Sequence, residues 1–421
     1  MCLIFRWLSL DPSRTAALSG LEVFVQSRRS GLAYSSDRNA DHGPNQHHAV
    51  SNLSAHLRHR LLLETEVLAA VLAKEGAQRA EKFIQEVCWR TYWKGWLEHR
   101  PHVWTQYKKQ RDDAQSLNPA LIKAIAKAKA GQTGIDCFDA WANELVQTGY
   151  LHNHARMWFA SIWIFTLRLP WAQGADWFMQ TLRDADAASN TLSWRWVAGL
   201  QTVGKHYLAR AENIHKNTGG RFDPRGQLNE SAAALTTPDE ASGFAASAAR
   251  FTHYREPVLN GNEVLLLHED DCYVESLPVI KTISALIVVP NASARSPSGV
   301  SAVSRAFTEA ALQDAAARAA ARWQLKFEQV IVLDEVAQLF DVCKTRAALQ
   351  GKAIVHAWLP VGPTRDALEL PLQQVASAGI AIHPVLRSWD QQAWPLATRG
   401  FFQFKTKIPE LLRDQFTPEL F

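Results

Sequence analysis

The sequence predicts two parts of different class: an α-helical domain first, then a doubly wound α/β domain. Helical periodicity without a clear strand marks the first half, and short apolar runs alternating with Ala-rich stretches mark the second. Between them the composition shifts to Gly, Ser, Ala and Pro over 217–260, which indicates a linker. We expect a helical domain over 1–225, a linker over 226–260 and an α/β domain over 261–421.

The helical elements follow from the spacing of apolar residues. A long helical stretch is expected over 63–100, and shorter ones over 150–168 and 174–183, separated by Pro170. In the first stretch the apolar residues at helical spacing are Val67, Val71, Ile84, Val87, Tyr92 and Trp96.

Five apolar runs in the second half read as strands. They lie at 263–271, 284–290, 327–334, 353–360 and 380–386. Continuous apolar runs are typical of parallel strands that helices cover on both faces, and the Ala-rich stretch 303–323 is one such helix. The half contains neither a GxGxxG motif nor a P-loop, so no dinucleotide or phosphate cradle is signalled.

Composition excludes several classes of protein. The 421 residues carry 45 Lys and Arg against 41 Asp and Glu, a net charge of only +4, and 47% are hydrophobic. This balance excludes a disordered chain or a polycation, so a nucleic-acid surface would be a local patch. No run of 18 apolar residues is present, so we expect no membrane span. We also expect a monomer, and the cysteines described next predict that it is cytoplasmic.

The cysteines and histidines predict neither disulfides nor a metal site. The five cysteines form no CxxC pair, and their odd number indicates a reducing compartment; they are Cys2, Cys88, Cys137, Cys272 and Cys343. None of the histidine clusters has metal-ligand spacing beside a carboxylate, so no bound metal is expected.

Polar side chains recur at helical spacing in three segments. Each set lies at i, i+3, i+4 or i, i+4 and so shares a helical face: Asn153, Arg156 and Met157; Asp186, Asn190 and Trp194; Glu86, Trp89 and Arg90. The neighbouring carboxylates of Asp184 and Asp186 need cations close by, and Arg156 is a candidate. Together the faces predict a polar cavity walled by Trp residues.

These segments resemble the FAD-binding helical domain of the DNA photolyase/cryptochrome family. The matching runs are EVCWR (86–90), TGYLHNHARM (148–157), WAQGADWFMQ (171–180) and DADAASNTLSWRW (184–196), and the resemblance covers roughly residues 10–225. It implies an FAD cofactor bound in a U shape. The positions that match the family's flavin contacts are Tyr34, Ser51, Asn52, Leu53, Ser54, Phe83, Glu86, Arg90, Tyr150, Asn153, Arg156, Asp184, Asp186 and Asn190.

The residues agree with that implication. Ser51 and Ser54 precede a helical run, AHLRHRLLLE, whose free N–H groups would favour a diphosphate. Arg156 would pair with Asp184 beside the isoalloxazine ring. Asp186 would accept a hydrogen bond from the ribityl chain or the adenine, and Asn190 would face flavin N5.

The resemblance also implies a reaction. In members that repair cyclobutane pyrimidine dimers in DNA, an acid, an Asn, a Met and two Trp line the lesion pocket, and the matching positions here are Glu86, Asn153, Met157, Trp89 and Trp196. We therefore expect a deoxyribodipyrimidine photolyase-like lyase. Its partner would be damaged DNA, single- or double-stranded, repaired by electron transfer from light-excited reduced FAD. Repairers of the (6-4) photoproduct use a His pair where this sequence has Asn153 and Met157, which favours dimer repair.

Two departures leave an alternative open. Family members carry Arg where this sequence has His154. Trp194 and Trp171 match two positions of the Trp electron relay, whereas the third falls near Ala114–Gln115, where no Trp stands. Trp104, Trp158 or Trp163 would have to substitute. The alternative is a cryptochrome-like blue-light receptor without repair activity, marked by a closed or altered lesion pocket.

Domain order is the largest departure. Family members place an α/β antenna domain before the helical domain, whereas here the α/β half follows it. The run GFFQFKTKIPELL (400–412) resembles the close of that antenna domain, which favours a permuted arrangement over an unrelated α/β domain. Whether an antenna chromophore binds stays open.

Overall fold

The computed structural model describes residues 11–27, 29–113, 118–202, 204–236, 249–346 and 348–416. The first half is helical, and its described residues contain no strand, as predicted. Its helices are α2 (Arg14–Gln26), α3 (Leu32–Asp37), α4 (Ser54–Arg58), α5 (Glu64–Arg79), α6 (Glu81–Glu98), α7 (Pro101–Asp112), α8 (Pro119–Lys129), α9 (Asp136–Thr148), α10 (Asn153–Ser161), the π-helix η2 (Ile162–Thr166), α11 (Trp171–Thr181), α12 (Ala187–Ala198) and α13 (Ala211–Asn217).

All five predicted strands form, and they make one parallel sheet. They are β1 (Val264–His268), β2 (Ala285–Val289), β3 (Val330–Val332), β4 (Ile354–Ala357) and β5 (Ile382–Val385), in the order β3-β2-β1-β4-β5. All their pairings are parallel. From β1 the chain first adds β2 and β3 on one side, and it then crosses over to add β4 and β5 on the other side. The direction in which strands are added therefore reverses between β1 and β4.

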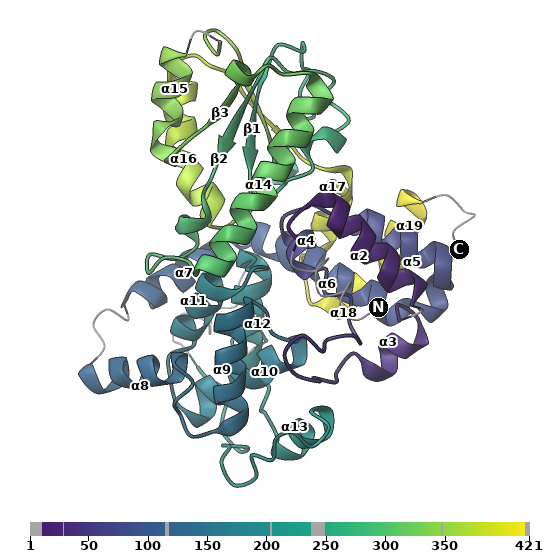
Figure 1. Cartoon of the computed structure of the whole chain (residues 1–421), viewed down its shortest axis with the longest axis vertical. Coiled ribbons are helices and arrows are strands. Elements are labelled where there is room, and N and C mark those ends of the chain that lie inside the picture. Colours follow the sequence, from purple (N-terminus) through teal and green to yellow (C-terminus); the bar gives the residue numbers. More distant parts are fainter. Residues whose placement is uncertain are drawn as a thin grey trace.

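Alternate side chains of β1 enter two separate hydrophobic cores, one on each face of the sheet. Leu265 and Leu267 join the large core that extends into the helical half, whereas Val264 and Leu266 join a smaller core. The predicted helix 303–323 is α14 (Ala302–Trp323), which packs on β1 and β2. The smaller core includes residues of α15 (Leu339–Thr345) and α16 (Pro363–Ser377). Figure 1 shows this α/β body above the helices.

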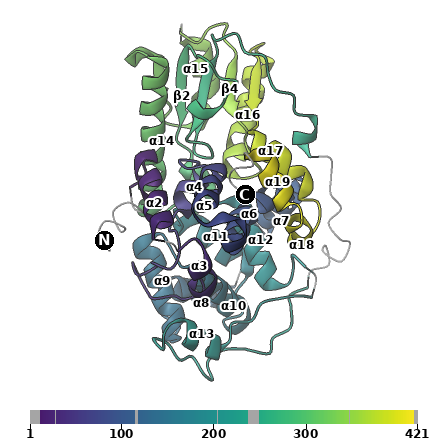
Figure 2. The ribbon, with the colours of Figure 1, turned by 90° about the vertical axis from the view of Figure 1, so that its right-hand side faces the viewer.

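The last helices return to the helical half. They are α17 (Ser388–Ala393), α18 (Phe401–Lys405) and α19 (Ile408–Gln415), and both α17 and α18 pack on α6. The indole N–H of Trp389 donates to Thr91 Oγ1 at 3.0 Å. A Cβ at Gly95 would lie 2.9 Å from Trp394 Cα, so glycine permits this close approach. Residues 388–415 thus complete the packing of α6, although the sequence groups them with the sheet (Figure 2).

The predicted helical run at 55–64 is wrong. Helix α4 ends at Arg58, and α5 begins at Glu64. Arg60 has φ 50°, and the bonds Leu61 N–H to His56 O and Arg60 N–H to Leu57 O close α4 as a Schellman motif. Arg60 occupies the left-handed position that glycine usually takes, and its guanidinium donates to Asp390 at 2.5 Å. Its ion pair lies between α4 and α17.

Other predicted helices differ in detail. The stretch 63–100 forms two helices, α5 and α6, and the stretch 150–168 forms α10 followed by η2. None of the helices in the described part of the chain is both long enough and apolar enough to cross a bilayer.

Candidate functional site

The start of α12 is built around the carboxylate of Asp186. Its Oδ1 accepts the Ser189 N–H at 2.8 Å, which caps the helix. Its Oδ2 lies 3.1 Å from Arg90 Nη1 and 3.5 Å from Lys94 Nζ, both from α6. Burial alone would raise the pKa of Asp186, but Lys94 and Arg90 hold it well below its ordinary value. Asp186 is therefore a buried, fully ionised carboxylate, and the protein itself engages both of its oxygens.

The predicted pair of Arg156 and Asp184 is confirmed by geometry. Arg156 Nη2 lies 2.8 Å from Asp184 Oδ2, and Arg156 Nε donates to Leu151 O at 2.9 Å. Burial disfavours the charge on Asp184, but the guanidinium lowers the pKa of that carboxyl below its ordinary value. The Tyr150 ring lies 5.3 Å from the Arg156 guanidinium carbon, which adds a cation–π contact.

Arg90 joins two helices to α6. Its Nε lies 3.0 Å from Glu64 Oε1 at the start of α5, and its Nη1 reaches Asp186 at the start of α12. Sequence reasoning found Arg90 but missed Glu64 and Lys94. The spacing signal for Lys94 was present, because it follows Arg90 by one turn on the same helix.

Asn190 is held by its neighbours. It lies one turn after Asp186 on α12 and is 9% exposed. Its amide Nδ2 donates to Ala175 O on α11 at 2.8 Å, which fixes the orientation of the amide.

Tyr34, Phe83 and Glu86 lie together at the junction of α3 and α6. The rings of Tyr34 and Phe83 meet edge to face at 5.1 Å. Glu86 follows Phe83 by one turn, and its Oε1 lies 3.7 Å from Arg38 Nε. Burial raises the pKa of Glu86, and Arg38 offsets this only in part. Glu86 therefore keeps a proton more readily than an ordinary glutamate.

The segment from Ser51 to Ser54 forms a tight turn. Ser51 Oγ accepts the Leu53 N–H at 3.4 Å, and Asn52 donates its amide to His47 O at 2.8 Å. Leu53 is buried, and Ser54 begins α4, which has only 5 residues. The hydroxyls of Ser51 and Ser54 remain candidate phosphate contacts, but the long helix expected behind them is absent.

The five residues expected to line a lesion pocket come from three helices, one of which packs on the other two. Glu86 and Trp89 lie on α6, Asn153 and Met157 on α10, and Trp196 on α12; α12 contacts both α6 and α10. Asn153 is exposed, and the other four are half-buried.

Both expected Trp walls have stacked partners that sequence reasoning missed. The ring of Phe401 lies parallel to Trp89 with centroids 3.5 Å apart, and Tyr207 stacks on Trp196 at 5.7 Å. The aromatic run GFFQF was visible in the sequence, but nothing in it pointed to Trp89.

His154 is engaged inside the protein. Its ring stacks on Trp158 at 4.2 Å, Nδ1 lies 3.2 Å from Asn39 O, and Nε2 lies 3.4 Å from the Tyr207 hydroxyl. Burial lowers the pKa of His154, so the ring is neutral near pH 7. It does not replace the positive charge that Arg would supply at this position.

Trp194 and Trp171 lie on the packed helices α12 and α11. A Cβ at Gly174 would come within 2.3 Å of Trp194 Cη2, so the indole lies directly on α11, one turn from Trp171. Trp171 lies 5.9 Å from Tyr107, and Trp194 meets Trp163 edge to face at 6.3 Å. The third expected position, Ala114–Gln115, falls outside the described residues.

A small cavity of about 10 Å³ joins this site to the sheet. It lies where the strand order reverses, since Asp270 follows β1 and the loop 360–363 follows β4, and it also touches Asp186. That volume holds about one water molecule. Among the described residues, no cluster of three or more His, Cys, Asp or Glu side chains could hold a metal ion.

The residues fit FAD as a ligand. One oxygen of Asp184, Oδ1, and the hydroxyl of Ser54 are both buried, and a weak contact with each other is the interaction they share. Buried polar atoms of this kind are satisfied when a polar ligand binds.

Comparison with known proteins points to one family. Residues 83–230 match the family model described as the FAD binding domain of DNA photolyase. Deoxyribodipyrimidine photo-lyases are similar at 33% identity over 183 residues in Streptomyces griseus, 34% over 194 in Agrobacterium fabrum and 31% over 227 in Escherichia coli. These matches cover 42%, 45% and 51% of this chain and 38%, 38% and 44% of those proteins, so the chain spans less than half of their length.

A solved structure is also similar. It is a bacterial class III photolyase from Agrobacterium tumefaciens, 28% identical, with a TM-score of 0.41 over 49% of this chain and 43% of that chain.

Proposed function

We propose that this chain, whose residues 83–230 match the FAD binding domain of DNA photolyase, binds FAD and uses light to split cyclobutane pyrimidine dimers in DNA. The observation that carries this proposal is the packing of α12 on α6 and α10. Those three helices bear Asp186, Arg90 and Arg156 for the cofactor, and also the expected substrate residues. One group of packed helices would therefore supply both the cofactor residues and the substrate residues.

The chain would hold FAD through opposite charges arranged around a buried centre. Arg156 and Asp184 form a fixed ion pair, and a polarised isoalloxazine ring beside it would find both a donor and an acceptor. Ser51 and Ser54 would donate hydroxyls to the diphosphate. The amide of Asn190, held by Ala175 O, would present its oxygen in one orientation.

When bound, FAD supplies light absorption and the one-electron transfer on which dimer splitting depends. The chain's own part is to hold the lesion. Trp89 and Trp196 supply flat apolar walls for a dimer flipped out of the helix, and Met157 supplies an adaptable apolar contact. Glu86, whose pKa burial raises, would hydrogen-bond to the polar edge of a pyrimidine through its carboxyl group.

The test is made on the purified full-length protein kept under reducing conditions. Its absorption spectrum is recorded, dimer-containing single- or double-stranded DNA is added, and absorbance near 260 nm is followed under blue light. Flavin bands with light-dependent recovery of thymine absorbance are expected. A protein without flavin bands would contradict FAD binding, and flavin bands without recovery would contradict repair.

Two observations favour a second candidate, a blue-light receptor that keeps the flavin and repairs nothing. Phe401 covers a face of Trp89, and the neutral, stacked His154 offers no cation to a DNA phosphate. The receptor would show light-induced changes in the protein and no preference for damaged DNA.

A further inference from the structure

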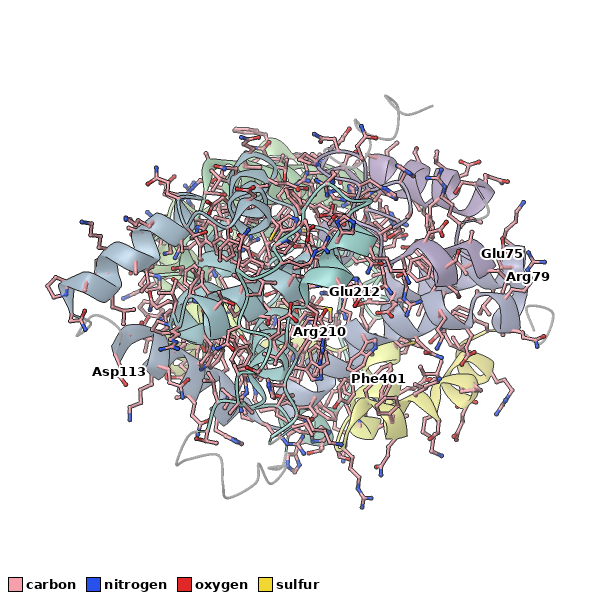
Figure 3. The ribbon with its side chains drawn as sticks, turned by 90° about the horizontal axis from the view of Figure 1, so that it is seen from below. Glu75, Arg79, Asp113, Arg210, Glu212 and Phe401 are labelled. Carbon is pink, nitrogen blue, oxygen red and sulfur yellow. The ribbon has the colours of Figure 1, made fainter. Side chains whose placement is uncertain are left out.

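Phe401 occupies a face of Trp89 in the manner of a stacked base. The two ring centroids lie 3.5 Å apart with an angle of 11° between the planes. Phe401 is the first residue of α18, the helix before α19. It is 6% exposed, whereas Phe402 beside it is 83% exposed. Figure 3 shows Phe401 where this helix meets the N-terminal half.

A nucleic-acid base and Phe401 compete for the same position. Bases stack on aromatic side chains through parallel contact of their faces, and the separation between Phe401 and Trp89 is already a full contact. No base fits between these rings.

The other neighbours of Trp89 come from its own helix. Trp93 lies 5.1 Å away at a tilt, and Tyr92 meets Trp89 edge to face at 5.5 Å. Both belong to α6, the helix that also carries Trp89. Phe401 is the stacked partner of Trp89 that comes from a distant segment of the chain, so its displacement would free a face of Trp89.

Helix α18 is short, and Phe401 itself supplies part of its packing on α6, since it also meets the Tyr92 ring at 5.4 Å. The helix has 5 residues, and Gly400 at its start makes no side-chain capping bond. Two hydrogen bonds hold the residues just before it: the Tyr92 hydroxyl donates to Arg399 O at 2.8 Å, and Arg100 Nη2 donates to Thr398 O at 2.7 Å. Lys405 and Glu81 pair at 3.2 Å with side chains 35% and 57% exposed, and such exposed pairs add little stability.

The end of α18 is anchored more firmly. Phe404 is 1% exposed and packs on Tyr92 at 5.5 Å, and Ile408, Leu411 and Leu412 of α19 are buried. If Phe401 leaves Trp89, Phe404 and α19 would keep the segment attached to the protein.

We propose that Phe401 is a removable cover on Trp89, which a pyrimidine flipped out of nucleic acid displaces in order to stack there. This inference rests on the proposed function, because it assigns Trp89 to the lesion pocket. The cover adds a cost to every binding event, so it disfavours bases that must also break good stacking in their own strand. A dimer or an already unstacked base loses little stacking energy when it flips out, so it can still displace Phe401. A base in an intact duplex loses more stacking energy and cannot.

The test compares binding of full-length protein to a labelled single-stranded oligonucleotide with one thymine dimer, in the dark, by fluorescence anisotropy. The variants are Phe401→Ala, Phe401→Leu and Trp89→Ala, with Phe402→Ala as the matched control on the same helix. Phe401→Ala should bind about 2- to 10-fold more tightly than the unchanged protein, the range that an aromatic stacking pair is worth. Phe401→Leu should fall between them, and Phe402→Ala should match the unchanged protein.

Each outcome decides a different point. If Trp89→Ala weakens binding but neither Phe401 variant tightens it, the cover is wrong and the lesion pocket stands. If Trp89→Ala binds as well as the unchanged protein, Trp89 does not face the substrate, and both the pocket assignment and the cover fail. Melting temperatures are measured beside each titration. Should Phe401→Ala fail to fold, the milder Phe401→Leu decides the question by itself.

Discussion

Lys94 Nζ lies 3.5 Å from Asp186 Oδ2, and both side chains are only 5% exposed. A buried ammonium is costly unless a carboxylate neutralises it; Asp186 does so for Lys94, and it shares Arg90 with Glu64. This carboxylate therefore supports the packing of α6 on α12 as well as the site.

Replacing Asp186 with Asn should lower the free energy of unfolding by about 3 to 5 kcal/mol, because the buried Lys94 loses the carboxylate beside it and Arg90 keeps only Glu64. Urea unfolding followed by circular dichroism measures the change. Asp223→Asn is the control, since Asp223 pairs with Arg225 at the surface and its loss should leave unfolding unchanged. Equal stability of Asp186→Asn and the unchanged protein would show that the two cations are neutralised elsewhere.

Stability should fall in acid because of Asp271. Burial alone would raise the pKa of Asp271, but Arg387 and Arg60 lower it to about 2. An unfolded Asp titrates near 3.9, so the unfolded chain takes up the proton first as pH falls. The contribution of Asp271, about 2 to 3 kcal/mol, is complete above about pH 5 and is lost between about pH 4 and pH 2.

The measurement is urea unfolding from pH 7 to pH 3. Asp271→Asn should be less stable at pH 7 and should show a shallower decline in acid than the unchanged protein. Parallel pH profiles for the two proteins would contradict the assignment.

Glu86→Ala should reduce light-driven repair about tenfold. That factor corresponds to the free energy that a hydrogen bond to a charged or strongly polarised group contributes. Flavin content, read from the visible spectrum, should stay the same. Glu309→Ala, which removes an exposed glutamate on α14, is the control and should repair normally. Unchanged repair in Glu86→Ala would remove this residue from the mechanism.

Gly174→Ala should destabilise the protein by about 1 to 3 kcal/mol, because the added methyl group would overlap the Trp194 ring at 2.3 Å. The same exchange at Gly400, where a Cβ meets nothing within 4 Å, should be close to neutral. Thermal unfolding of the two variants side by side measures the difference. A neutral Gly174→Ala would mean that α11 and α12 separate easily.

Trp194→Phe should abolish photoreduction of oxidised flavin while leaving repair by chemically reduced protein in place. Trp323→Phe, at the end of α14 in the other half, serves as the control. Absorbance under blue light with an external thiol reductant measures the rate. Normal photoreduction in Trp194→Phe would place the start of the electron route at another residue.

The sequence predicted the sheet well because burial on both faces leaves a plain signal. Each of the five apolar runs became a parallel strand, and the Ala-rich stretch became α14. The pair of Arg156 and Asp184 was also predictable, since a buried carboxylate requires a cation.

Contacts between distant segments were beyond the sequence. Nothing local to EVCWR shows that Phe401 stacks on Trp89, because no periodicity links residues so far apart. The early end of α4 was hidden for a different reason. Arg60 carries no glycine signal for its left-handed backbone, and the buried carboxylate that pairs with it comes from α17.

The return of α17 to α6 has a consequence for how the chain folds. Thr91 and Trp389 are 298 residues apart and share a hydrogen bond, so this face of α6 stays open to solvent until the end of the chain has been synthesised. Contacts of such long sequence separation form late, and an exposed apolar face meanwhile invites aggregation. A ribosome-bound chain that stops before residue 388 should therefore engage chaperones through α6, and release from them should follow the arrival of the last three helices.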